Sequence, residues 1–131
     1  PIRCFHSERK VVKQERDIRV IQAAVKQSKK GLIPRLHELC SFREFLQNSQ
    51  SRQQGFIAHL EDGVRTVVTA IDWSKETWVL LGPEGDFAPE EIRQAEDAGW
   101  KGLDLGPEVL RTETAALTVA ASAYLDGLSS K

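Results

Sequence analysis

The 131-residue chain contains 40% apolar and 28% charged residues, which is ordinary for one soluble globular domain. Its longest uncharged run, residues 114–125, is far shorter than the roughly 20 apolar residues of a membrane span, and no signal-like segment opens the chain. We therefore expect a single soluble, cytoplasmic domain over residues 1–131. Cys4 and Cys40 are too few for a disulfide framework and match no metal-ligand spacing.

The net charge of −1 is distributed unevenly along the chain. Residues 1–60 hold 12 Lys and Arg against 5 Asp and Glu, whereas residues 61–131 hold 6 against 14. A cationic surface for a phosphate backbone and an ordinary solvated helix face both fit this pattern. Ten of these 12 cations are candidates for such a surface: Arg3, Arg9, Lys10, Lys13, Arg16, Arg19, Lys26, Lys29, Lys30 and Arg35.

The first half of the chain predicts two helices. Apolar residues recur at three- and four-residue intervals over residues 15–30, which indicates an amphipathic helix ended by Gly31. Ser41 is suited to cap a second, shorter helix. The polar residues 47–54 predict a loop.

The second half predicts alternating strands and helices. Residues 55–60 and 77–81 are short apolar runs typical of strands buried on both faces, and residues 64–71 fit either a helix or a strand. A helix over 89–98, with proline at its first position, precedes a strand over 103–105. This order predicts an α/β domain with a mainly parallel sheet.

A final helix is predicted from a capping Thr112 to about Leu128. It has almost no polar stripe, so it must be covered on more than one side. A second subunit and burial within the monomer both satisfy this requirement.

Two glycine-bearing bends, residues 81–87 and 105–114, follow the last two predicted strands. Ligands of open α/β sheets bind at the carboxyl ends of strands, and glycine there lets the main chain approach a ligand closely. Each bend alone is also an ordinary turn, but the pair indicates a binding site. We find no phosphate-binding loop, dinucleotide fingerprint, hydrolase elbow or metal-ligand spacing among His6, His37 and His59.

Several segments of the sequence resemble those of a known family. Residues 80–85 (LLGPEG), the helix from Pro89 and above all residues 105–116, which contain LRTETAA, resemble the 16S ribosomal RNA uracil-N3-methyltransferases, the RsmE family of the SPOUT superfamily. Residues 7–9 and 24–28 fall where similar segments lie in that family.

The resemblance implies a fold of mainly parallel sheet with helices on both faces and a C-terminal trefoil knot. It also implies S-adenosylmethionine bound within the knot and a homodimer with the site near its interface. Family members carry an N-terminal PUA-like RNA-binding domain that is absent from these 131 residues, so we interpret the chain as the catalytic domain.

The resemblance also assigns roles to residues. Asp86 stands where the family usually has glycine, and Glu108 where it commonly has a basic residue. Arg111 would hold the cofactor carboxylate or stabilise a deprotonated uracil, and either Glu84 or Glu113 would be the general base. The implied cofactor-binding residues are His59, Leu60, Leu81, Gly82, Gly85, Leu105, Gly106, Val109 and Leu110.

The resulting hypothesis is methylation of uracil N3 in 16S ribosomal RNA of the small subunit, by direct transfer that needs no metal. A ribose 2′-O-methyltransferase of the same superfamily is the first alternative, although its usual Asn-x-x-Arg signature is not evident. A noncatalytic RNA-binding or ribosome-assembly module is the second.

Overall fold

The structure, a computed structural model, describes residues 1–7, 13–29 and 31–129. None of the helices in these ranges is long and apolar enough to cross a membrane. The elements are β1 (Ile2–Arg3), α1 (Gln14–Ser28), β2 (Cys40–Ser41), α2 (Phe42–Asn48), β3 (Gln54–Ala58), β4 (Arg65–Val67), the 3₁₀ turn η1 (Val68–Ala70), β5 (Thr77–Leu81), α3 (Pro89–Asp97), β6 (Lys101–Asp104) and α4 (Thr112–Ser129).

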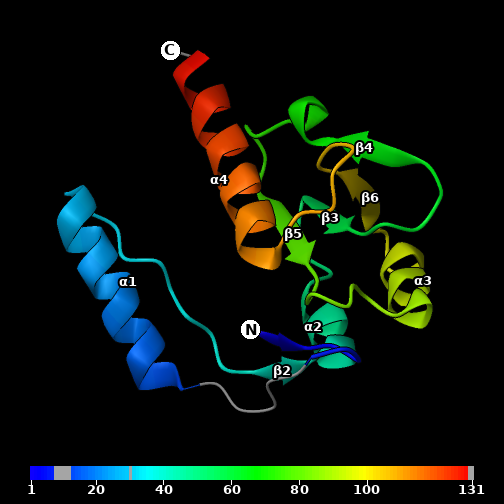
Figure 1. Cartoon of the computed structure of the whole chain (residues 1–131), viewed down its shortest axis with the longest axis horizontal. Helices are drawn as coiled ribbons and strands as arrows, with labels where there is room; N and C mark the ends of the chain where they lie inside the picture. The colour runs from blue at the N-terminus through cyan, green and yellow to red at the C-terminus, as the bar shows by residue number, and fades with distance from the viewer. Residues whose placement is uncertain (8–12, 30, 130–131) are drawn as a thin grey trace.

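A four-stranded sheet forms the centre of the molecule (Figure 1). Its strand order is β4-β6-β3-β5, and every neighbouring pair is parallel. At the carboxyl end of β3, Ala58 is aligned with Leu81 of β5 on one side and Leu103 of β6 on the other. This arrangement confirms the predicted parallel sheet. β1 and β2 form a separate two-stranded parallel sheet.

Both faces of the central sheet are covered, because the strands bury apolar side chains on alternate sides. Along β3, Phe56 belongs to one core cluster and Ile57 to the other. The Ile57 cluster contains residues of α2 and α3, including Leu46 and Ile92. The Phe56 cluster contains Val68 of η1 and packs against Val119 of α4, so helical segments lie on both sides as expected.

Short-range hydrogen bonds explain where the helices of the Ile57 face begin. Ser41 caps α2 through a reciprocal capping box with Glu44, as its sequence position predicts. The Ser41 hydroxyl and N–H both donate to the Glu44 carboxylate, which lowers the pKa of Glu44. α3 begins with Pro89 at its first turn, and the Glu91 carboxylate accepts hydrogen bonds from the N–H groups of Ala88 at 2.9 Å and Phe5 at 2.8 Å. Glu91 therefore holds the N-terminal segment against the helix.

Three local expectations are corrected by the structure. α1 ends at Ser28 with Lys29 in the left-handed region (φ 53°), so Gly31 is not its terminator, and Lys30 lies outside the described residues. Residues 64–71 contain both a strand, β4, and the η1 turn. Thr112 is the first residue of α4 rather than its cap, because its hydroxyl donates to the Gly82 carbonyl instead.

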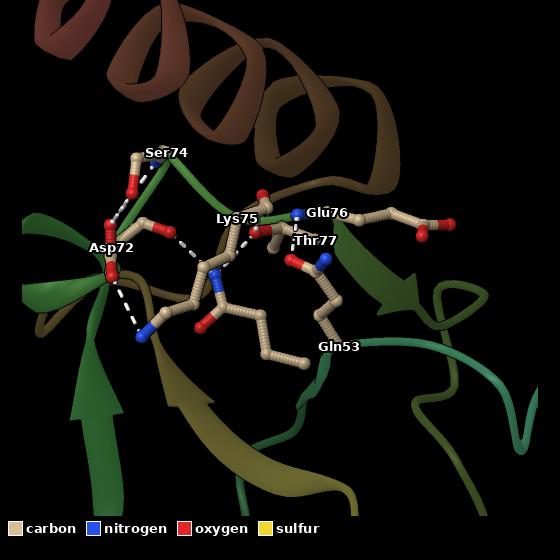
Figure 2. A network of polar contacts seen from close by, with 7 residues as sticks. Gln53, Asp72, Ser74, Lys75, Glu76 and Thr77 are labelled. Atoms are coloured by element: carbon tan, nitrogen blue, oxygen red, sulfur yellow. Dashed lines mark hydrogen bonds and ion pairs between the residues drawn. The ribbon is translucent and has the colours of Figure 1, made fainter.

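A polar network holds together the amino ends of β3 and β5 (Figure 2). The Asp72 carboxylate pairs with Lys75 at 2.8 Å and accepts from the Ser74 hydroxyl and N–H, and these contacts lower the pKa of Asp72 to about 2. Gln53 accepts from the Glu76 N–H at 3.0 Å. These contacts lie at the opposite end of the strands from the glycine bends, so we interpret the network as structural.

α1 and α4 contrast with this covered centre. α1 contains no buried residue and stands to one side of the sheet in Figure 1. In α4 only Ala115 is buried, and Leu117 is 70% exposed. Burial of α4 within the monomer, one of the two predicted explanations, is therefore wrong for the described residues.

Candidate functional site

The two predicted bends meet at one cavity. β5 and β6 flank β3 in the same direction, so the turns that follow them lie at the same sheet edge. The Thr112 hydroxyl donates to the Gly82 carbonyl at 2.8 Å and joins the second bend to the first. The cavity holds about 90 Å³ and is lined by Ala58, His59, Leu60, Arg65, Leu81, Gly82, Pro83, Glu84, Asp86, Leu103, Asp104, Leu105, Gly106, Glu108, Val109, Leu110, Thr112 and Ala115.

The first bend packs tightly against the protein itself. A Cβ atom added at Gly82 would lie 3.1 Å from the Phe87 ring, and one at Gly85 would lie 3.1 Å from the His6 Cβ. The His6 Nδ1 is also 3.0 Å from the Asp86 carbonyl oxygen. The glycines of this bend therefore allow close packing of Phe87 and of the N-terminal segment, a contact that the sequence did not indicate.

The second bend differs because its glycine faces open space. Gly106 has a φ of 118°, a conformation that residues with a side chain rarely adopt, and a Cβ there would meet no atom within 4 Å. Its N–H donates to the Asp104 carboxylate at 2.9 Å. A ligand can therefore approach the main chain closely at this bend.

The end of β3 forms a third part of the wall. His59 is 6% exposed, and among the described residues neither of its ring nitrogens has a hydrogen-bond partner. Its carbonyl accepts from the Arg65 guanidinium at 3.0 Å. The Leu60 N–H donates to the Asp86 carboxylate at 2.9 Å. The polar group left without a protein partner at this end of β3 is thus the imidazole of His59, because both of these main-chain groups are already engaged.

Most residues named from the sequence come together here. Gly85, Arg111 and Glu113 do not line the cavity, although Arg111 lies between two residues that do, Leu110 and Thr112. The predicted residues that line it are His59, Leu60, Leu81, Gly82, Glu84, Leu105, Gly106, Val109 and Leu110.

Sequence reasoning assigned a role to Glu84 but to none of the other charged residues of the lining. Arg65 comes from β4, whose position beside β6 only the sheet order reveals. Asp104 ends β6 directly before the second bend, which is a signal that the sequence offered. Asp86 and Glu108 were noticed only as departures from the family pattern.

The charge of the lining favours a cationic ligand. Four carboxylates, those of Glu84, Asp86, Asp104 and Glu108, line the cavity against the single guanidinium of Arg65. The positive sulfonium of S-adenosylmethionine suits this balance, and the open main chain at Gly106 suits a nucleoside. The residues present therefore fit the cofactor.

The cavity is smaller than pockets that enclose ligands of this size. Pockets that enclose drug-sized ligands usually hold about 300–1,000 Å³, whereas this cavity holds about 90 Å³. A ligand as large as S-adenosylmethionine would extend beyond it and need another surface for cover. A larger cavity of about 910 Å³ lies between β1, β2, α2 and β5, where the second bend contributes no residue.

Comparison with known proteins defines the class. A family model described as the RNA methyltransferase domain matches residues 1–124, so the chain belongs to that family. The chain is similar to two proteins named ribosomal RNA small subunit methyltransferase E. It is 28% identical to that of Bacillus subtilis over 112 residues, 80% of this chain and 44% of the relative. It is 33% identical to that of Mycobacterium bovis over 101 residues, 74% of this chain and 38% of the relative.

Solved structures agree with this assignment. A methyltransferase from Legionella pneumophila with bound S-adenosylmethionine is similar at a TM-score of 0.81 and 26% identity, covering 98% of this chain and 54% of its own. Ribosomal RNA small subunit methyltransferase E of Neisseria gonorrhoeae, also bound to S-adenosylmethionine, is similar at 0.75 and 28% identity, covering 98% and 53%. These similarities confirm the family resemblance and the α/β fold, and the trefoil knot stays a prediction. The chain spans less than half of either sequence relative described above.

Proposed function

We propose that this chain is the catalytic part of an S-adenosylmethionine-dependent methyltransferase that modifies uracil N3 in 16S ribosomal RNA of the small subunit. The observation that carries the proposal is the meeting of both glycine bends at one cavity, joined by the Thr112–Gly82 hydrogen bond. The similarity to S-adenosylmethionine-bound methyltransferases supports the cofactor class. The substrate is inferred from the relatives named for the small ribosomal subunit.

The chain's own residues would bind the cofactor mainly through the main chain. Leu81 and Gly82 form one wall, and Leu105, Gly106 and Leu110 form the other. When bound, S-adenosylmethionine supplies a methyl group on a positively charged sulfonium. Holding this group in line with the uracil is the main contribution we assign to the pocket, since orientation alone can lower a barrier by about 7–11 kcal/mol.

The acid–base residues would act at the uracil ring. The N3 proton must leave before methylation, and of the two predicted bases Glu84 lines the cavity whereas Glu113 does not. Glu84 is therefore the preferred general base, with its carboxylate accepting the N3 proton. Arg111 follows the cavity residue Leu110 and is exposed, so its guanidinium would stabilise the uracil anion at the mouth of the pocket.

The cationic first part of the chain would contact the RNA. On α1, Arg16, Arg19 and Lys26 are exposed and lie within one stripe of the helix, because their spacings of three and seven residues are close to whole turns. The other helix-flanking cations Lys13 and Lys29 are also exposed. Arg9, Lys10 and Lys30 of the predicted cationic set lie outside the described residues. Such a stripe attracts phosphate groups without reading sequence.

A second copy of the chain would complete the site. The cavity is too small to enclose the cofactor, and α4, which starts at the cavity, leaves an apolar surface uncovered. A homodimer that packs against α4 accounts for both observations. We propose that this dimer acts in the cytoplasm, where it meets ribosomal RNA.

The binding test uses two glycines with positive φ. Gly106→Val places a side chain in the open space of the cavity and should abolish S-adenosylmethionine binding measured by calorimetry. Gly63 also has a positive φ (151°) and open space around it but does not line the cavity, so Gly63→Val is the matched control for backbone strain. Binding retained in Gly106→Val would remove the pocket from the proposal.

The reaction test requires the full-length protein and small-subunit RNA. Mass spectrometry of the modified nucleoside should identify 3-methyluridine. A 2′-O-methylated nucleoside would favour the related ribose methyltransferase, and the absence of methyl transfer despite cofactor binding would favour a noncatalytic RNA-binding module.

A further inference from the structure

Asp86 occupies a backbone conformation that normally favours glycine. Its φ is 62°, in the left-handed region, where aspartate is tolerated better than most residues with a side chain. Its N–H closes the first bend by donating to the Pro83 carbonyl at 2.9 Å. Glycine adopts this conformation at no steric cost, so the side chain of Asp86 is an addition to a turn that does not need one.

Both oxygens of that side chain are engaged by the main chain. Oδ1 accepts from the Phe87 N–H at 2.7 Å, and Oδ2 accepts from the Leu60 N–H at 2.9 Å. Hydrogen bonds to an ionised carboxylate are roughly twice as strong as neutral ones. The carboxylate therefore joins two segments that are 26 residues apart in the chain.

These contacts continue the connection between two strands beyond their paired region. The register of β3 with β5 ends at the pair Ala58 and Leu81, and Leu60 lies two residues further along. Phe87 is 3% exposed and belongs to the Ile57 cluster. Through Asp86, the exposed Leu60 segment is thus tied to a residue fixed in the core.

The position of Asp86 connects this joint to the ligand. Asp86 and Leu60 both line the cavity, and Asp86 Oδ1 lies 3.3 Å from where a Cβ of Gly82 would be. Without the carboxylate, the hydrogen bond that holds the Leu60 segment against the first bend would be lost.

We propose that Asp86 is a positioning residue of the cofactor pocket: its carboxylate clamps the end of β3 to the bend after β5 and so fixes the Leu60 wall. This inference rests on the proposed function for the identity of the ligand. The clamp itself is a property of the ligand-free protein.

The test compares Asp86→Gly, which keeps the backbone conformation, with Asp86→Asn, which keeps one acceptor oxygen. Amide exchange followed by NMR should show the Leu60 N–H exchanging at least about ten-fold faster in Asp86→Gly, because its acceptor is gone. The affinities for S-adenosylmethionine and S-adenosylhomocysteine should both fall about ten-fold in Asp86→Gly and by a smaller, equal factor in Asp86→Asn. Asp62→Gly, an exposed aspartate outside the cavity, is the control and should change neither measurement.

Several outcomes would overturn the clamp. Unchanged affinity for both ligands in Asp86→Gly would do so, with its thermal unfolding measured to confirm that the variant folds. A loss confined to the cationic S-adenosylmethionine would show that the carboxylate acts through its charge and would also overturn it. If the unaltered protein binds neither ligand, the proposed function fails, and Leu60 exchange still decides whether the clamp exists.

Discussion

The helices α3 and α4 are buried to an extent opposite to what their compositions suggest. α3 is short and charged, yet it buries Glu91, Ile92 and Ala95 against the sheet. α4 is long and mainly apolar, with only Glu113 and Asp126 charged, yet it buries only Ala115. An amphipathic helix needs one covered face, which this chain supplies, whereas a helix that is apolar all round needs cover from elsewhere. The comparison teaches that α3 packs on a core that this chain completes by itself, whereas α4 presents an apolar surface that the described residues leave exposed.

Removing a side chain from the core beneath α3 should have the largest effect on stability. Ile57 is fully buried beneath α3, and Ile57→Ala should lower the free energy of unfolding by about 2–5 kcal/mol, because it removes buried methyl groups and leaves a cavity. Urea denaturation measures this loss. Val67→Ala, at a half-exposed strand position, should cost much less. Similar costs at both sites would show that the α3 side is not the better-packed core.

Introducing charges on the exposed apolar surface of α4 should break the proposed dimer and leave the fold intact. Leu117 and Leu128 are exposed and lie on one stripe of α4, eleven residues apart. Leu117→Asp with Leu128→Asp should weaken self-association at least about 100-fold, because each buried carboxylate would lack a partner. Sedimentation measures the effect, and Leu32→Asp, at another exposed leucine, is the control. A monomeric unaltered protein would contradict the second-subunit interpretation of α4.

The two cysteines should give the smallest effect of the three. Cys4 is buried in the Ile57 cluster, and burial, with Glu91 nearby, raises the pKa of its thiol to about 11. The neutral thiol is therefore favoured by folding, and this contribution to stability is present below about pH 9 and is lost as the pH rises through 11.

At pH 8 an alkylating reagent should therefore modify the half-buried Cys40 at least about ten-fold faster than Cys4, as followed by mass spectrometry. In urea the two rates should become similar. Equal rates in the folded protein would mean that the core around Cys4 is open.

Much of the fold followed from local patterns. The apolar runs of β3 and β5, the proline that begins α3 and the serine that caps α2 act over a few residues, so their elements could be predicted. The site was located at the glycine bends because parallel strands place their carboxyl ends together. Arg65 and the contact of His6 with Gly85 could not be predicted, since they depend on strand order and on the path of the N-terminal segment.

The sequence alone determined β3, β5, β6, the helices and the two bends, because periodicity and turn chemistry are properties of neighbouring residues. Only the tertiary structure decided that the bends share a cavity, that Thr112 bonds Gly82 rather than capping α4, and that Asp86 holds Leu60. It also decided that most of α4 remains exposed. The physical reason is that these contacts join segments 26 or more residues apart, whose distance is set by the register of the parallel sheet.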